Sequence, residues 1–290
     1  MKPLNFILCF ALFGLFACSD DSVNEPINPE ANLVIKFKFD SNQIRLDNLG
    51  QPATIPNGNA AQSPDFARMS SHYIEFAPTA NTLLGQGAIV YNGVTTTIGG
   101  EEAIDFSQAK FAGNNETFVT VPLSQVAEGN YTWVRVSLAY QEGGIDFLAA
   151  DGNEYSGTLA SFVGYNTYVP TLAFNGATFP VNANKIQGFW AFEALGFTSQ
   201  GQAPPGATTV PNPLFNSSPI PQGSCVVTGE FENGLTISGE ETEDVIVTLS
   251  FSVNNSFEWT EINTDGKYEP QAGEQLVDMG LRGLIPMVSN

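Results

Sequence analysis

Basic residues are scarce in this chain. Its 290 residues include 10 Lys and Arg against 30 Asp and Glu, which gives a formal net charge of −20 at pH 7. Binding to nucleic acid depends on Lys and Arg that neutralise phosphates, and docking on an anionic lipid surface depends on the same charges. The composition therefore argues against a nucleic acid partner and against an electrostatically docked membrane protein, and it favours a soluble, self-repelling surface.

Histidine and cysteine are almost absent. His72 is the one histidine, whereas a zinc or copper site usually has several His or Cys ligands. No Gly-x-Ser-x-Gly motif of a hydrolase nucleophile is present. The paired carboxylates of a glycosidase have no spacing rule by which they could be recognised among thirty acids. The sequence thus gives no positive support for an enzyme, and a hydrolase that uses acidic residues is kept as an alternative.

One long apolar run is present, and it lies at the N-terminus. It extends from Leu4 to Phe16, follows Lys2 and leads into Ala17-Cys18, which is the order of regions in a secretory signal. The run is shorter than the roughly 20 residues of a membrane-spanning helix. The segment resembles a bacterial lipoprotein signal with a lipobox. The resemblance implies that residues 1–17 are removed and that acyl chains on Cys18 anchor the protein in a membrane; a signal without lipidation and a permanent transmembrane anchor are the alternatives.

The residues after Cys18 refine this expected location. Ser19-Asp20-Asp21 resembles the surface-export signal of Bacteroidota lipoproteins, which implies an outer-membrane protein exposed on the cell surface. A periplasm-facing protein is the alternative. Residues 18–31 are polar, acidic and interrupted by Pro26 and Pro29, so we expect a flexible tether. Cys225 would be the one free thiol of the mature chain, and its apolar neighbours predict a buried side chain in a strand.

The rest of the chain has the pattern of strands. No long segment has helical periodicity, whereas apolar and polar residues alternate over 33–39 and 245–253. Residues 88–98 contain Asn92-Gly93, which predicts a type I′ hairpin turn. We therefore expect residues 32–290 to form an all-β domain, an antiparallel β-sandwich with long Pro- and Gly-rich loops. The prolines of 200–223 mark a possible subdomain boundary, and two packed β subdomains split near residue 200 are the alternative.

Residues 33–140 also resemble the N-terminal part of the MbnP-like family of copper-binding proteins. The resemblance is carried by the strands Leu33–Phe39 and His72–Phe76, by Ala103–Phe106, and by Phe118–Pro122 leading to the Gly129-Asn130-Tyr131 turn. It implies a β-sandwich. The copper function is not carried over, because this chain has a single histidine.

Residues 261–274 resemble the first half of an EF-hand or dockerin calcium loop. In that resemblance the side chains of Glu261, Asn263 and Asp265 and the carbonyl of Lys267 would bind Ca²⁺, and Glu269 would bind it directly or through water. Ala272 occupies the place of the bidentate acid, and Glu274 could replace that acid only in a loop two residues longer. We expect a bound Ca²⁺ to be structural. A plain Asx-rich turn at 263–266 is the other interpretation.

Aromatic residues are the other candidates for binding. A platform for sugar rings could be formed by Trp133, Tyr165, Tyr168, Trp190 and Phe192, although alternation also permits core packing of these rings. The leading hypothesis is a non-enzymatic, lipid-anchored surface protein that binds an extracellular glycan or protein. The alternatives are a calcium- or copper-binding module of the cell envelope and a hydrolase that uses acidic residues.

Overall fold

The chain folds into β-sheets, as the sequence predicts. The structure, a computed structural model, describes residues 30–203, 219, 223–281 and 283–289. In these residues the regular elements are strands and short 3₁₀ turns, with no α-helix. The expected signal peptide, Cys18, most of the tether and most of the proline-rich segment 200–223 lie outside the described residues.

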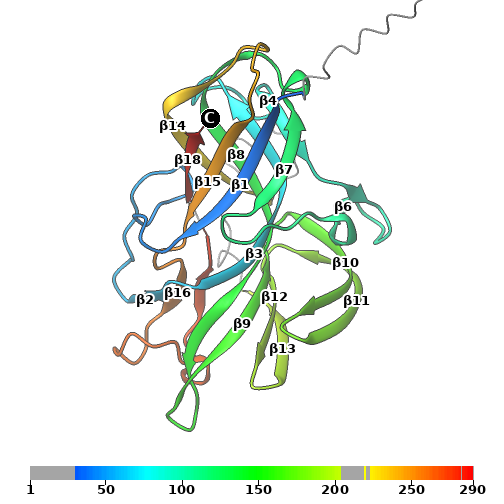
Figure 1. The fold of residues 1–290 in the computed structure, drawn as a ribbon. Helices are drawn as coiled ribbons and strands as arrows, with labels where there is room; N and C mark the ends of the chain where they lie inside the picture. Colours follow the sequence, from blue (N-terminus) through cyan, green and yellow to red (C-terminus); the bar gives the residue numbers. More distant parts are fainter. Residues whose placement is uncertain (1–29, 204–218, 220–222, 282, 290) are drawn as a thin grey trace, which may run out of the picture.

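The upper half of the molecule is a two-layer sandwich (Figure 1). One layer has the strand order β18-β15-β1-β7, with bounds Gly283–Ser289, Val245–Ser252, Asn32–Asp40 and Thr117–Pro122. The facing layer contains β3 (Asp65–Ala77), β4 (Ala88–Asn92), β14 (Cys225–Ile237) and the first part of β8 (Gly129–Leu148). Apolar residues of both layers form the main core, which includes Cys225 as predicted.

The sequence pattern of β1 explains this packing. Leu33, Ile35 and Phe37 are fully buried, while the residues between them are half-buried. Phe37 stacks on Phe118 of β7 and meets Phe251 of β15 edge to face, with ring centroids 4.3 Å and 5.2 Å away. Alternation therefore places one face of the strand in the core.

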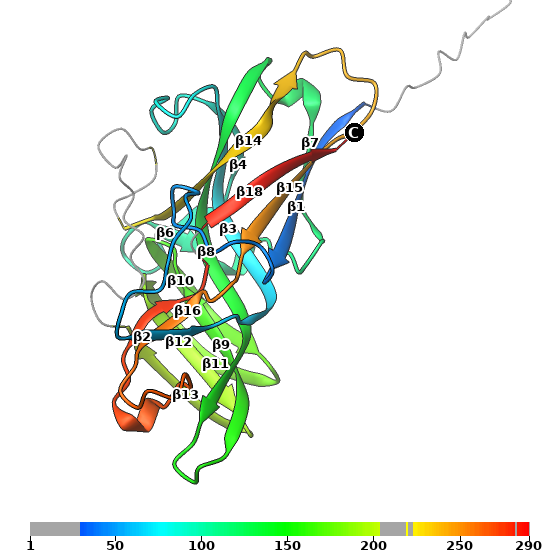
Figure 2. The ribbon, with the colours of Figure 1, turned by 90° about the vertical axis from the view of Figure 1, so that its left-hand side faces the viewer.

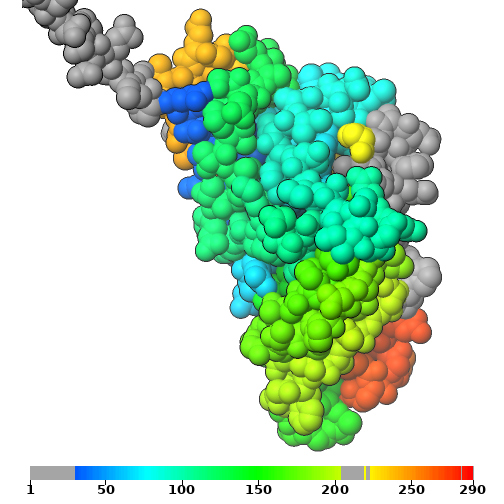
Figure 3. Space-filling view, turned by 90° about the vertical axis from the view of Figure 1, so that its right-hand side faces the viewer, coloured from blue at the N-terminus to red at the C-terminus, as the bar shows by residue number. Residues whose placement is uncertain are grey.

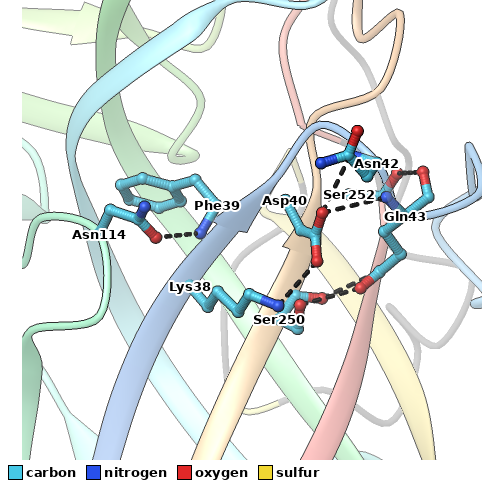
Figure 4. Close-up of polar contacts among 8 residues, drawn as sticks. All are labelled: Lys38, Phe39, Asp40, Asn42, Gln43, Asn114, Ser250 and Ser252. Carbon is cyan, nitrogen blue, oxygen red and sulfur yellow. Dashed lines mark hydrogen bonds and ion pairs between the residues drawn. The ribbon is translucent and has the colours of Figure 1, made fainter.

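Polar contacts fix the end of β1 (Figure 4). The carboxylate of Asp40 accepts hydrogen bonds from Lys38 Nζ at 2.7 Å and from the backbone N–H groups of Asn42 and Gln43 at 2.9 and 3.1 Å. These bonds, that of Lys38 first, hold the pKa of Asp40 below its ordinary value. The side chain of Gln43 in turn bonds to Ser250 of β15. The chain therefore leaves β1 in a defined direction.

β8 connects the two halves of the molecule. It pairs with β3 and β14 in its first part and with β9 (Glu154–Phe162) in its second part. β12 (Phe189–Ala194) and β13 (Phe197–Gln202) extend the same sheet beyond β9. The sheet thus runs from the upper sandwich to the lower end (Figure 1).

Two smaller sheets cover the lower half. One contains β11 (Ala177–Ile186), β10 (Asn166–Phe174), β6 (Ala103–Asp105) and β5 (Thr95–Thr96). The other contains β17 (Leu276–Met279), β16 (Phe257–Thr260) and β2 (Asn59–Gln62). A separate apolar cluster lies under each sheet. Figure 2 shows β2 and β16 beside the lower part of β8, below the strands of the sandwich.

The pairing of strands differs from the sequence prediction in two respects. The hairpin around Asn92-Gly93 does not form, because β4 pairs with β3 and β5 pairs with β6. The sheets are also not purely antiparallel, since β1 pairs in parallel with β15 and β6 with β10. Strands on the two sides of the proline-rich segment join one sheet, because β14 pairs with β8.

Candidate functional site

An apolar pocket of about 280 Å³ lies at the lower end of the molecule. Its first wall is the lower sheet, with Ile145 and Phe147 of β8, Leu159 of β9, and Trp190 and Phe192 of β12. Its second wall comes from the C-terminal part of the chain. That wall comprises Phe257, Tyr268, Pro270 and Leu276. The orange-red C-terminal segment accordingly lies against the yellow-green strands at this end of the space-filling view (Figure 3).

Two glycines make room for the rings of β12. A Cβ atom on Gly157 would lie 2.1 Å from Cζ of Phe192, and one on Gly201 would lie 2.7 Å from Cζ2 of Trp190. Real Cβ atoms do not approach other atoms so closely. Each ring therefore lies flat over a neighbouring strand that has no side chain at that point, an arrangement that also compensates for a glycine inside a strand.

Contacts between rings hold the pocket open in one shape. Phe147 meets Phe192 nearly at right angles, with centroids 5.5 Å apart, and Phe257 meets Tyr268 in the same way at 5.2 Å. Such edge-to-face pairs add roughly 0.5–1.5 kcal/mol each beyond the burial of their area. Burial, and then the charge of Glu274, raises the pKa of Tyr268 to about 12. Its hydroxyl is therefore neutral at physiological pH.

Two more hollows adjoin the pocket and share Phe147 with it. One, of about 440 Å³, is mostly apolar and extends over Tyr155, Phe192 and Phe197. The other, of about 190 Å³, is more polar and is lined by Asp146, Glu154 and Lys267 among others.

The rim of these hollows is mainly acidic. It carries Asp146, Asp151 and Glu154, and its one Lys is Lys267, which forms an ion pair with Glu154 at 2.7 Å. The arrangement can hold an apolar group with a cationic or amide group beside it.

The candidate calcium loop forms part of the pocket wall. Its carboxylates accept hydrogen bonds from the loop backbone: Glu261 from the N–H groups of Asp265 and Gly266, both at 2.8 Å, and Asp265 from that of Lys267 at 2.9 Å. The buried Glu274 accepts from Ile262 at 3.0 Å and from Glu269 at 2.6 Å. Asn263 donates through its amide to Glu269. Backbone N–H groups therefore stabilise these negative charges directly.

Metal-binding chemistry has little geometric support in the described residues. No three His, Cys, Asp or Glu side chains there lie together as a metal site would require. Calcium binding by residues 261–274 stays a prediction. The loop is also tied to β8, because Leu148 donates its N–H to the Tyr268 carbonyl at 2.8 Å and the Gln271 amide donates to the Leu148 carbonyl at 2.8 Å.

His72 lines neither this pocket nor its adjoining hollows. It is buried on β3, its ring meets that of Tyr165 edge to face at 5.6 Å, and its Nδ1 has no hydrogen-bond partner in the described part of the chain. Burial lowers its pKa from 6.5 to about 4. A neutral, buried imidazole that packs against an aromatic ring fits a structural role.

Of the five predicted platform residues, the structure brings two together. Trp190 and Phe192 line the pocket, whereas Tyr165 is buried beside His72. Trp133 and Tyr168 lie on β8 and β10 and do not line the pocket or its adjoining hollows. Sequence reasoning missed Phe147, Phe257 and Tyr268. A signal was available in Gly157 and Gly201, since glycines inside strand-like segments indicate a close approach.

Comparisons with known proteins add no relative: the chain matches no family model, and no curated protein or solved structure is significantly similar to it. In the described ranges, no helix has the length and hydrophobicity needed to cross a membrane.

Proposed function

We propose that the protein is a lipid-anchored lipoprotein of the cell surface that binds an extracellular ligand, without catalysis, in the aromatic pocket at its lower end. The anchor is Cys18, expected from the signal sequence. The observation that carries the proposal is the pocket itself. It combines five aromatic rings with aliphatic side chains, and its volume is close to the lower limit of known ligand pockets, about 300 Å³.

The position of the pocket fits an anchored protein. β1 begins and β18 ends at the top of the molecule, and β9 and β13 lie at the opposite end (Figure 1). Leu159 of β9 and Ser199 of β13 line the pocket. The described chain begins at residue 30, so a tether from Cys18 would join the upper end. A lipid on Cys18 would thus leave the pocket at the end of the domain that is farthest from the tether. The acidic composition would also keep the domain off an anionic membrane, because the head groups would repel it.

The chemistry of the pocket favours an apolar ligand group over a bare sugar ring. Ser199 is its one residue with an aliphatic hydroxyl, and Tyr268 adds a phenol. A sugar site needs several donors and acceptors to replace the hydration of the sugar hydroxyls. The ligand group that we propose is therefore an aromatic or branched aliphatic one, belonging to a protein or to a substituted glycan.

Titration of the full chain in detergent with indole tests the proposed site. The readout is calorimetry or the fluorescence of a dye that indole displaces, measured at wavelengths where tryptophan does not emit. We expect saturable binding that weakens about tenfold or more in Phe192→Ala, because the variant removes a wall of the pocket. Tyr168→Ala, an aromatic residue away from the pocket, is the matched control. Equal binding by both variants would show that indole binds elsewhere.

A further inference from the structure

The strand beside the pocket is an edge strand in the part of the chain that the structure describes. β13 is the last strand of its sheet, and in the described residues β12 is its one partner. All its residues but Gly201 are exposed, and the side chain of Phe197 is 80% accessible. An edge strand presents unpaired N–H and C=O groups on which another strand can pair.

This edge lacks the devices that protect the edge strands β18, β11 and β7. Among the described strands, β4 and β2 are edges that also lack proline and charge, but they are shorter. β18 contains Pro286, β11 contains Pro180 and Lys185, and β7 ends in Pro122. β13 reads Phe-Thr-Ser-Gln-Gly-Gln and has neither a proline nor a charge. Proline and charge normally prevent the pairing of edges. Their absence here leaves a six-residue edge that is open to pairing.

The turn before β13 also exposes apolar side chains. Leu195 and Gly196 have φ angles of 54° and 82°, as in a type I′ turn, in which Asn or Gly is the usual first residue. A leucine in this left-handed conformation is strained, and its side chain is 65% exposed. Leu195 is thus an exposed apolar residue in an unfavourable backbone conformation, and it lies next to Phe197.

The side chains of β13 link its edge to the pocket. Ser199 lines both the pocket and the larger apolar hollow, and Gly201 lies under Trp190. Side chains of a strand that pairs with β13 would alternate in the same way, so that every second one faces the apolar surface. Recognition of this kind combines backbone pairing with pockets for alternate side chains.

We infer that the ligand is an extended segment of a partner protein, which adds to the sheet as a strand along β13. One aromatic or branched aliphatic side chain of the segment enters the pocket, and a nearby Lys or Arg faces Asp146 and Asp151. A second copy of this chain is disfavoured by the repulsion between two molecules of charge −20. The inference rests on the proposed function and names the ligand of the same pocket.

A phage-displayed library of random ten-residue peptides, selected on the full chain in detergent and counter-selected on Ser199→Trp, tests the inference. The new indole fills the pocket from the edge strand. Gln200→Trp is the control, since it places the same side chain on the opposite face of β13. We expect enriched peptides with an apolar residue near a Lys or Arg, and affinities that fall about tenfold or more in Ser199→Trp but stay within about twofold in Gln200→Trp.

Methylation of alternate backbone amides in the enriched peptides separates strand pairing from pocket binding. We expect an affinity loss of about tenfold for the register whose N–H groups face β13 and little loss for the other register. Equal affinity of all methylated peptides, or no enrichment, would overturn the inference. Binding of indole in the pocket would then leave the proposed function intact, whereas loss of indole binding as well would refute both.

Discussion

At the scale of single residues, the shape of the pocket depends on two glycines that have no Cβ atom. Phe192 and Trp190 lie where they do because Gly157 and Gly201 have no Cβ, and Phe147 then packs edge to face on Phe192. The shape of the pocket is therefore determined by pairs of a glycine and an aromatic residue on neighbouring strands, and not by the aromatic residues alone.

A Gly157→Val substitution tests this dependence. The new side chain would overlap Phe192 and push its ring into the pocket, so we expect a loss of about 1–3 kcal/mol in the free energy of unfolding and loss of indole binding. Urea denaturation and the indole titration provide the two readouts. Ser156→Thr, at the preceding and exposed position of β9, keeps the hydroxyl that donates to Asp146 and should change neither appreciably. Unchanged binding in Gly157→Val would show that the ring is not held by this contact.

His72 gives the protein a pH-dependent stability. Its pKa is about 4 in the folded protein and 6.5 in the unfolded chain, so between these values the unfolded chain binds more protons. Stability should consequently fall as the pH decreases from 6.5 towards 4, by up to roughly 3 kcal/mol from this residue. The neighbouring Tyr165 stays neutral there, because burial raises its pKa to about 12. Urea denaturation between pH 4.5 and 7.5 should show a flatter dependence in His72→Gln, and equal slopes would contradict the assignment.

At the scale of elements, strand positions could be predicted from the sequence more readily than strand partners. Alternation located β1 and β15, because one face of each strand is buried. It could not reveal that these strands pair in parallel across more than 200 residues. Asn92-Gly93 predicted a hairpin between the residues on its two sides, but β4 pairs with β3 instead, which lies earlier in the chain. The sequence predicted only residues of the first wall of the pocket, Trp190 and Phe192. The second wall comes from β16, β17 and the 261–274 loop, whose pairing with the lower sheet has no local sequence signal.

Glu274 should be essential for the shape of that loop. Its buried carboxylate accepts two backbone hydrogen bonds, from Ile262 and Glu269. Replacement in Glu274→Ala leaves both N–H groups without an acceptor, and we expect a loss of about 1–3 kcal/mol in the free energy of unfolding. Urea denaturation measures it. Gln275→Ala, at an exposed neighbour, is the control, and equal stability of the two variants would contradict this role.

Calcium binding at the same loop is tested by thermal unfolding. If Glu261, Asn263 and Asp265 bind Ca²⁺, the melting temperature of the chelator-stripped protein should rise saturably with Ca²⁺, and the rise should be absent in Asp265→Ala. The hydrogen bonds that Glu261 and Asp265 accept from the loop backbone leave lone pairs on each carboxylate, so Ca²⁺ need not displace them. An unchanged melting temperature would eliminate the calcium site and leave the hydrogen-bonded turn.

At the scale of the whole molecule, the proposed anchor and the proposed binding site lie at opposite ends. β8 makes this possible, because a single strand of 20 residues belongs to both halves and carries Phe147 near its end. β1 starts in the upper sandwich, and β9 and β13 lie in the lower half (Figure 1). Leu159 of β9 and Ser199 of β13 line the pocket.

Lipidation is tested by Cys18→Ser in the native host or a related bacterium. We expect the wild-type protein to incorporate labelled palmitate, to fractionate with the outer membrane and to be cleaved by protease on intact cells. The variant should lose the label and leave the membrane, since the acyl chains supply the anchor. Palmitate labelling without cleavage on intact cells would indicate a periplasm-facing protein instead.

The central claim is that ligands bind in the aromatic pocket, and methyl NMR on the full chain in detergent tests it most directly. Ile145, Leu159 and Leu276 line the pocket, whereas Leu172 and Val169 lie in the core on the other face of the sheet. Titration with a peptide enriched on the wild-type chain should shift the methyl signals of the first group and leave those of the second unchanged. Shifts confined to other parts of the molecule would contradict the account.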